Sequence, residues 1–320
     1  MSLGEFELIA RYFQQSQQGS ASGVALGIGD DCALLEVPAG EQLAVSVDTL
    51  NEAIHFPCGI DPYSLGWRAL AVNLSDLAAM GVTPRWFTLA LTLPEVKTDW
   101  LQCFSQGLFA LADQHGITLV GGDTTRGPLS ITIQVMGAVP VGQALTRHGA
   151  KAGDHIYVSG WLGLAAAGLA QLHAGESMLS ELEQAFYQPQ PRNELGLALR
   201  GVAHSAIDVS DGLLQDLGHI AKASGIQAEI SLAQLPMAQV LKDKFSPEQV
   251  MCWVQAGGDD YELCFTAPES LHDQLLTLSR RLDLSLHRIG RITEGEAGKV
   301  VCLDDQGQAT ELGASGYTHF

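Results

Sequence analysis

The sequence predicts an α/β chain, with α and β elements mixed throughout, that folds into two domains. Its 320 residues are enough for two domains of ordinary size. With 46% hydrophobic and 17% charged residues, the chain can bury a sizeable core. Segments of helical period and of strand alternation follow one another along the whole sequence. A cluster of glycine, proline and charge at 140–154 is the best candidate linker, so we expect domains at 1–147 and 148–320.

Each element of the first half has a recognisable pattern. Apolar residues at helical spacing predict helices at 6–13, 63–80 and 100–115, the last two ended by Gly81 and Gly116. Alternation predicts a strand that ends at Asp48, and further strands are expected at 86–93, 117–121 and 131–135. The polar, glycine-rich stretch 16–23 is expected to be a loop.

The second half repeats this mixture. Strands are expected at 155–159, 206–209, 227–232, 261–265 and 287–292. Helices are expected after the Gly160–Gly163 turn as far as His173, from Glu194 onward, and from Leu213 to Ala223 after Asp211-Gly212.

The net charge excludes some partners. A charge of −19 and a pI near 4.7 argue against nonspecific binding to nucleic acid or to an anionic membrane surface. The longest run of small apolar residues, Leu162–Leu172, is too short to span a bilayer. The acidic start around Glu5 and Glu7 does not resemble a signal peptide. The six cysteines contain no CxxC pair and are expected to be reduced, mostly buried thiols of a cytoplasmic protein.

Short acidic motifs are the most informative feature of the chain. They stand next to glycine or a small hydroxyl residue, at Gly27–Asp31, Ser46–Thr49, Asn73–Asp76, Gly121–Arg126, Asp208–Gly212 and Gly257–Glu262. Carboxylates that are far apart in sequence suggest ligands brought together by folding. Mg²⁺ prefers oxygen ligands and is usually held by a few carboxylates together with substrate phosphates. A magnesium-dependent enzyme that acts on a phosphorylated substrate is therefore the first hypothesis.

Each motif also has a simpler explanation. Asp and Asn are common in turns, and Asp-Gly is an ordinary turn sequence. Asp76 lies within an apolar helix beside Asn73 and Ser75, where it is either a ligand or part of a solvated stripe. The carboxylates alone do not distinguish Mg²⁺ from Ca²⁺.

Cations and histidines offer weaker signals. Arg126 and Arg147 are candidates for phosphate contacts, although most arginines are solvated surface residues. His55 follows the strand that carries Asp48. No Walker A motif is present, because Gly298-Lys299 precedes Val300 where Ser or Thr is required.

Four of the motifs resemble one family closely. Gly-Ile-Gly-Asp-Asp-Cys-Ala at 27–33, Asn-Leu-Ser-Asp-Leu-Ala-Ala-Met-Gly at 73–81, Gly-Gly-Asp-Thr-Thr-Arg-Gly at 121–127 and Asp-Val-Ser-Asp-Gly-Leu at 208–213 are similar to those of the thiamine-monophosphate kinases. These enzymes belong to the aminoimidazole-ribonucleotide-synthetase-like superfamily. The resemblance runs from Gly4 to Tyr317, and it excludes the selenophosphate synthetases, whose reactive cysteine or selenocysteine is missing here.

The resemblance implies a reaction and a set of site residues. It implies ATP-dependent phosphorylation of thiamine monophosphate to thiamine diphosphate, with several Mg²⁺ ions and possible K⁺ stimulation. The implied metal ligands are Asp31, Ser46, Val47, Asp48, Asp76, Asp123, Asp208 and Asp211. The implied ATP contacts are Asp31, Gly122, Asp123, Arg147 and Ser210, and the implied thiamine monophosphate contacts are His55, Asp259 and Tyr317. The family often has Thr at position 47 and usually Glu at 259, so Val47 would contribute only its backbone.

The family also implies an assembly. Its N-terminal α/β domain binds ATP and metal and forms a β-barrel across a homodimer, with the nucleotide near the subunit interface. Its C-terminal domain is also α/β. A phosphate monoester is largely dianionic at neutral pH, so direct in-line transfer to it needs alignment and charge neutralisation rather than a strong general base.

Two other functions remain open from the sequence. A related synthetase could form an acyl-phosphate-like or iminophosphate intermediate on an amide or formyl acceptor. A regulatory protein could bind metal or nucleotide without turnover.

Overall fold

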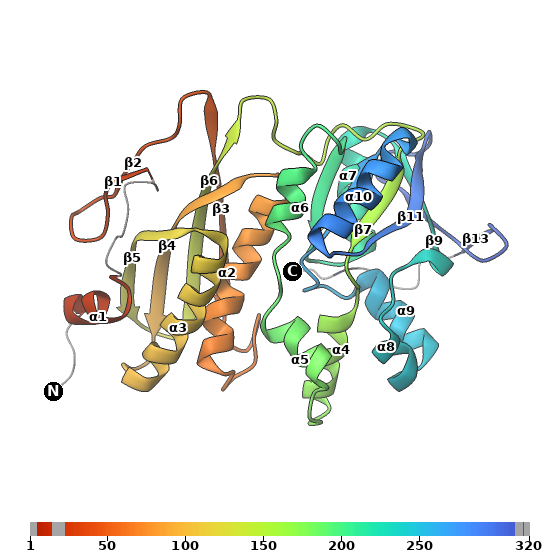
Figure 1. The fold of residues 1–320 in the computed structure, drawn as a ribbon. Helices are drawn as coiled ribbons and strands as arrows, with labels where there is room; N and C mark the ends of the chain where they lie inside the picture. Colours follow the sequence, from red (N-terminus) through yellow and green to blue (C-terminus); the bar gives the residue numbers. More distant parts are fainter. Residues whose placement is uncertain (1–4, 15–22, 311–315, 317–320) are drawn as a thin grey trace. The chain divides into compact units, whose positions relative to one another are not determined.

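The chain forms two compact units in a computed structural model that describes residues 5–14, 23–310 and 316. Unit 1 comprises Met1–Leu77 and Val82–Gly142, and unit 2 comprises Ala78–Gly81 and Gln143–Phe320. Most elements of both units are labelled in Figure 1. Tyr317 and most of the 16–23 loop lie outside the described residues.

Unit 1 is built on a four-stranded sheet. Its elements are α1 (Glu5–Tyr12), β1 (Val24–Leu26), β2 (Leu34–Leu35), β3 (Glu41–Asn51), α2 (Pro62–Ala79), β4 (Thr83–Leu93), α3 (Thr98–His115), β5 (Thr118–Arg126) and β6 (Ser130–Pro140). The strand order is β3-β6-β4-β5, with β4 and β5 parallel and the other pairs antiparallel. Strands β1 and β2 form a separate antiparallel pair.

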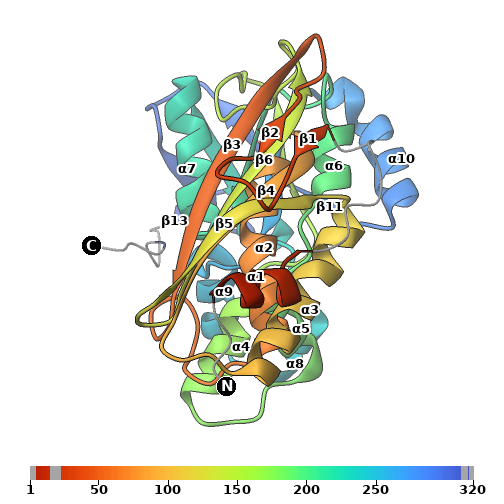
Figure 2. The same ribbon diagram turned by 90° about the vertical axis from the view of Figure 1, so that its left-hand side faces the viewer.

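Two helices pack together on one side of the sheet. Figure 2 shows the four strands with α2 and α3 behind them. The helices approach through their backbones, because a Cβ on Gly66 would lie 2.1 Å from the Phe104 carbonyl oxygen, and one on Gly107 would lie 1.9 Å from that of Tyr63. Only glycine permits such an approach. Helix α3 ends as expected at Gly116, which is left-handed and donates its N–H to helix carbonyls.

The other face of the sheet exposes apolar side chains. Leu43, Val45 and Val47 alternate along β3 and are 48%, 51% and 56% exposed. The sheet is open, with β3 and β5 as its two edges, and the described part of the chain contains no closed barrel. A barrel would therefore need strands from a second copy.

Unit 2 is built on a seven-stranded sheet of order β13-β12-β9-β11-β7-β10-β8. Its strands are β7 (His155–Ser159), β8 (Ser205–Val209), β9 (Gln227–Ser231), β10 (Glu262–Ala267), β11 (Leu286–Thr293), β12 (Val300–Leu303) and β13 (Ala309–Thr310). Its α-helices are α4 (Leu164–His173), α5 (Ser180–Tyr187), α6 (Asn193–Ala198), α7 (Leu213–Ser224), α8 (Gln239–Lys244), α9 (Pro247–Ala256) and α10 (His272–Leu282), and short 3-10 turns lie at Leu232–Gln234 and Glu269–Leu271.

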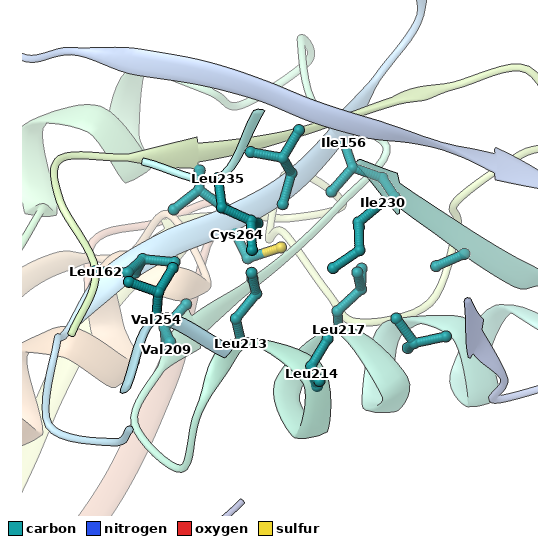
Figure 3. Close-up of a cluster of buried hydrophobic side chains, with 14 of the residues drawn as sticks. Ile156, Leu162, Val209, Leu213, Leu214, Leu217, Ile230, Leu235, Val254 and Cys264 are labelled. Atoms are coloured by element: carbon teal, nitrogen blue, oxygen red, sulfur yellow. The ribbon is translucent and has the colours of Figure 1, made fainter. Parts of the chain in front are cut away.

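Two hydrophobic cores lie on the two faces of this sheet. Ile156 and Val158 of β7 pack into the first core, whereas Tyr157 between them packs into the second. The first core also contains Leu213 and Leu217 of α7, which Figure 3 shows beside Cys264 of the sheet. The second contains residues of α6 and α10. Helices on both faces confirm the mixed α and β prediction for this unit, in which, among the described strands, only β12 and β9 pair in parallel.

The strand expected at 131–135 continues to Pro140, and two strand ends predicted at acidic motifs were also wrong. Strand β3 does not end at Asp48 but continues to Asn51, and β5 continues beyond Gly121 to Arg126. The reason is pairing, since Asp48 lies opposite Ile133 of β6 and Asp123 lies beside Ala90 of β4. Cross-strand hydrogen bonding therefore extends both strands through polar residues that are typical of turns.

The expectation of mostly buried cysteines was also wrong. All six are free thiols, but only Cys264 and Cys302 are buried, whereas Cys32, Cys58 and Cys252 are exposed. No helix among the described residues is both long enough and apolar enough to cross a bilayer.

Candidate functional site

In unit 1, the fold brings three of the implied metal ligands together. The Ser46 hydroxyl on β3 donates a hydrogen bond of 2.5 Å to Oδ2 of Asp76 on α2. Two residues further along β3, the Asp48 N–H donates to Oδ1 of Asn73, one turn before Asp76, at 3.1 Å. Asn73 is 1% exposed, and its Nδ2 donates to the Ala69 carbonyl. A buried amide thus fixes the edge strand to the helix, and Ser46, Asp48 and Asp76 share one side of the sheet.

Val47 lies between these residues but faces the other way. Its side chain is exposed on the apolar face together with Leu43 and Val45. Successive side chains alternate across a strand, so Ser46 and Asp48 cannot share a face with Val47. The contribution of Val47 through its backbone stays a prediction.

The diglycine motif lies at the opposite edge of the same sheet. Gly122 has φ +151°, and a Cβ there would lie 1.9 Å from the Leu89 carbonyl oxygen of β4. The close approach of two backbones therefore requires glycine. Asp123 follows it and is exposed on β5. Two strands separate β5 from β3, so within one chain Asp123 lies roughly 14 Å from Asp48 as measured across the sheet.

Asp31 and His55 lie in turns of unit 1. Asp31 is exposed, and its N–H is held by Oδ1 of Asp30 at 2.8 Å. His55 is half-buried, and its Nδ1 accepts the Asn51 N–H at 3.0 Å. A neutral ring that accepts at Nδ1 carries its proton on Nε2.

A hollow in unit 1 is lined in part by the chain segment that carries this histidine. It has a volume of about 370 Å³ and is lined by Glu52, Gly59, Ile60, Pro62, Leu93, Pro94, Glu95, Lys97, Trp100 and Leu129. Apolar walls with a few charged groups are typical of a small-molecule site. None of the sequence-predicted site residues lines it, although His55 lies on the same segment as Glu52 and Gly59.

In unit 2, the implied residues lie on one strand and the turn that follows it. Asp208 is 5% exposed at the carboxyl end of β8, and Ser210 and Asp211 are half-buried in the turn before α7. The side chain of Asp211 accepts a hydrogen bond from Gln215 at 3.1 Å. Residues 208–211, at the end of β8 and in the turn, therefore contain one hydroxyl and two carboxylates.

A second turn lies against the first. The Asp259 N–H donates to the Ser210 carbonyl, and the Tyr261 N–H donates to the Val209 carbonyl, both at 2.9 Å. The Tyr261 hydroxyl donates to Oδ1 of Asp259 at 2.9 Å. Asp259 and Tyr261 have left-handed φ values of 67° and 51°. Asp259 is therefore held beside Ser210 by an unusual backbone conformation.

Two carboxylates at these turns were not predicted as site residues: Asp216, which is 2% exposed, and Asp260, which is half-buried. Asp216 accepts N–H groups from Ser210, Asp211 and Gly212, and Asp260 accepts the Gly163 N–H at 2.9 Å. Burial, and then the charge of Asp211, raises the pKa of Asp216 to about 7 in spite of those N–H groups. Burial likewise raises the pKa of Asp260 well above its usual value. The only sequence signal was an acid near a predicted one. Asp260 directly follows Asp259, and Asp216 lies a few residues after Asp211.

Arg147 is the remaining predicted residue of unit 2. It is exposed, and its carbonyl accepts a hydrogen bond from Ser224 at 3.2 Å. The backbone of Arg147 is therefore hydrogen-bonded to the last residue of α7. Its role as a phosphate contact stays a prediction.

The donor set suits a hard cation but is incomplete within each unit. Among the described residues, no three His, Cys, Asp or Glu side chains are grouped closely enough to bind a metal on their own. Oxygen donors instead occur as a few neighbours, Ser46 with Asp48 and Asp76, and Asp208 with Asp211. Such sets suit Mg²⁺, which keeps several waters and takes further ligands from substrate phosphates.

Comparisons with known proteins agree on one family. Residues 29–139 match the N-terminal domain model of AIR synthase related proteins, and residues 151–303 match the C-terminal domain model. The chain is 50% identical to the thiamine-monophosphate kinase of Escherichia coli (strain K12) over an alignment of 326 residues, which covers all of this chain and 99% of the relative.

Solved structures give the same result. The thiamine-monophosphate kinase of Stenotrophomonas maltophilia K279a superposes with a TM-score of 0.86 at 48% identity, covering 97% of this chain and 99% of that one. AaThiL in complex with AMPPCP and TMP superposes with a TM-score of 0.78 at 30% identity, covering 92% of each chain. With both domain models matched in order and half of all residues identical to a full-length relative, this chain belongs to the thiamine-monophosphate kinase family of enzymes.

Proposed function

We propose that the protein transfers the γ-phosphoryl group of ATP directly to thiamine monophosphate, which yields thiamine diphosphate and ADP. The observation that carries this proposal is the fixed group of Ser46, Asp48 and Asp76 between β3 and α2. The relative that binds AMPPCP and TMP supports the two substrates, since AMPPCP is an ATP analogue. Thiamine diphosphate biosynthesis would be the role of the reaction.

Each unit carries residues proposed to bind metal, nucleotide or substrate. Unit 1 would contribute Asp31, Ser46, Val47, Asp48, Asp76 and Asp123 to Mg²⁺, and unit 2 would contribute Asp208 and Asp211. The ATP contacts would be Asp31, Gly122, Asp123, Arg147 and Ser210, and the thiamine monophosphate contacts would be His55, Asp259 and Tyr317. When bound, Mg²⁺ would neutralise phosphate charge in a chain whose own net charge is −19.

The chain's own residues would position the two substrates and neutralise phosphate charge. They would not take up or release protons. The acceptor phosphate is already nucleophilic as a dianion, so no general base is required. His55 would contact the substrate from the turn in which its Nδ1 accepts the Asn51 N–H. Gly122 would let its backbone approach the nucleotide, and the Arg147 guanidinium would bind phosphate oxygens.

The first experiment is a product assay. The purified protein is incubated with ATP, Mg²⁺ and thiamine monophosphate, with and without K⁺. We expect thiamine diphosphate and ADP in equal amounts. If ATP binds but no thiamine diphosphate forms, the activity lies elsewhere in the superfamily, and amide, formyl and phosphate acceptors are tested next. ATP and Mg²⁺ binding without turnover of any acceptor would favour a regulatory protein.

We further propose a cytoplasmic homodimer in which two copies cover the exposed sheet face. Three β3 residues there, Leu43, Val45 and Val47, are each about half exposed. A contiguous apolar patch of this kind is typical of a protein interface. The open sheet has two free edges, which a second sheet could close into a barrel. All six cysteines are free thiols, in keeping with a reducing compartment.

The assembly can be tested by placing a charge on that face. Val45→Asp should convert a dimer into a monomer in sedimentation experiments, because an unpaired carboxylate would have to be buried in the interface. Asp113→Asn, on the exposed side of α3, is the matched control and should leave the mass unchanged. A wild-type protein that sediments as a monomer at assay concentrations would contradict the proposed homodimer.

A further inference from the structure

The turn between β8 and α7 is organised by a side chain to which nothing above assigns a role. Oδ2 of Asp216 accepts three successive backbone N–H groups, from Ser210, Asp211 and Gly212, each at 3.1 Å. Asp216 itself is 2% exposed on the first turn of α7, where its N–H donates to the Gly212 carbonyl at 3.0 Å. A carboxylate oxygen that accepts three amides makes strong, charge-assisted hydrogen bonds.

The hydrophobic core holds both ends of this turn. Val209 before it and Leu213 after it are fully buried, and Figure 3 shows both in the cluster around Cys264. Gly212 has φ 124°, and a Cβ there would lie 2.9 Å from the backbone of Ala256. The chain therefore requires glycine at the last position of the turn.

These contacts decide which groups the turn offers to a ligand. The amides of residues 210–212, just before α7, all donate to Asp216, so they are not free for an anion. The backbone that Asp216 holds in this way carries the hydroxyl of Ser210 and the carboxylate of Asp211, which are half-buried. A hydroxyl and a carboxylate are oxygen donors of the kind that Mg²⁺ prefers.

We propose that Asp216 is a positioning residue, which holds Ser210 and Asp211 in the conformation that binds the metal–nucleotide complex. This inference rests on the proposed function of that turn. Residues behind a metal site that orient its ligands commonly change metal affinity or activity by roughly 10- to 100-fold when replaced.

Two variants separate the turn's geometry from its charge. Asp216→Asn keeps an acceptor oxygen of the same reach, whereas Asp216→Ala removes it. Mn²⁺ is titrated into each folded protein in the presence of ATP and followed by its electron paramagnetic resonance signal. We expect Asp216→Ala to weaken Mn²⁺ binding by roughly 10-fold or more and Asp216→Asn to restore much of the loss. Backbone hydrogen exchange in the peptide that contains residues 210–212 should be fastest in Asp216→Ala, slower in Asp216→Asn and slowest in the wild type.

Asp154 provides a matched control. It is another carboxylate of unit 2, 3% exposed, and its Oδ2 accepts the Lys151 N–H at 2.8 Å. The strand register places it at the far end of the sheet, because His155 pairs with Ala267 whereas Val209 pairs with Glu262. Asp154→Ala should lower stability without changing Mn²⁺ affinity.

Three results would overturn the proposal. They are equal Mn²⁺ affinity in Asp216→Ala and Asp154→Ala, an Asp216→Asn protein as impaired as Asp216→Ala, and unchanged exchange at residues 210–212. If Asp216→Ala does not fold, Asp216→Ser, whose hydroxyl is too short to reach the three amides, takes its place. Since binding and exchange are read without turnover, a protein that fails to make thiamine diphosphate refutes the proposed function while leaving this test intact.

Discussion

Asp76→Asn is expected to lower kcat by roughly 100-fold or more while leaving the fold intact. Asn has nearly the same shape as Asp, and its Oδ1 can still accept the Ser46 hydroxyl that now donates to Asp76 at 2.5 Å. The link between β3 and α2 would therefore persist, supported by the Asn73 contact with Asp48. What disappears is one negative charge next to Asp48. A metal ligand contributes several kcal/mol of charge stabilisation in phosphoryl transfer, and about 2.7 kcal/mol corresponds to 100-fold in rate.

The measurement is steady-state turnover as a function of Mg²⁺ concentration, with thermal unfolding to verify the fold. Asp113→Asn serves as the control, because it removes the same charge from an exposed position of α3 in the same unit. We expect the control to retain turnover close to that of the wild type. A normal rate in Asp76→Asn at every Mg²⁺ concentration would show that Asp76 only joins β3 to α2 and does not bind the metal. The same reasoning applies to Asp31→Asn and Asp208→Asn.

The largest effect on stability is expected from Arg192→Met. Arg192 donates from Nε and Nη2 to the two oxygens of Glu262, at 2.7 and 2.5 Å, and Glu262 is 4% exposed. The Ser159 hydroxyl donates to the same carboxylate, while its oxygen accepts the Leu263 N–H. Without the arginine, a buried carboxylate would lose its only oppositely charged partner among these contacts. Breaking one side of a buried pair typically costs about 3–5 kcal/mol.

Denaturant unfolding of the Arg192→Met protein would test this expectation. A variant at an exposed ion pair serves as the control. Arg291 pairs with Glu229 at 3.1 Å, but its side chain is 64% exposed. Arg291→Met should therefore change the free energy of unfolding by no more than about 1 kcal/mol. Replacing both partners, as Arg192→Met with Glu262→Gln, should recover part of the loss because no uncompensated charge remains. Equal losses from the two single arginine variants would contradict the assignment of Arg192–Glu262 as a buried pair.

Local patterns in the sequence were sufficient for most of the helices and for the family. The period of α2 and α3, the glycine that ends α3, and the strand–turn–helix around Asp211-Gly212 depend on neighbours within a few residues. Such short-range preferences are visible without a structure. The acidic motifs identified the family for a similar reason, since each is a short run of residues that a turn or a ligand requires. Sequence reasoning did not predict α5, α8, α9 and α10, although α9 has a local signal, a capping box formed by Ser246 and Gln249 around Pro247.

Only the tertiary structure decided how those residues meet. Strands β3 and β5 continue through Asp48 and Asp123 because partners more than thirty residues away in sequence complete their hydrogen bonding. The contact between Ser46 and Asp76 depends on a helix packing on a strand. Asp216 looked like any acid on a helix until the fold placed three amides around it. The physical reason is the same in each case: a polar group's role depends on which distant backbone it faces once the core has closed, and a local pattern does not contain that information.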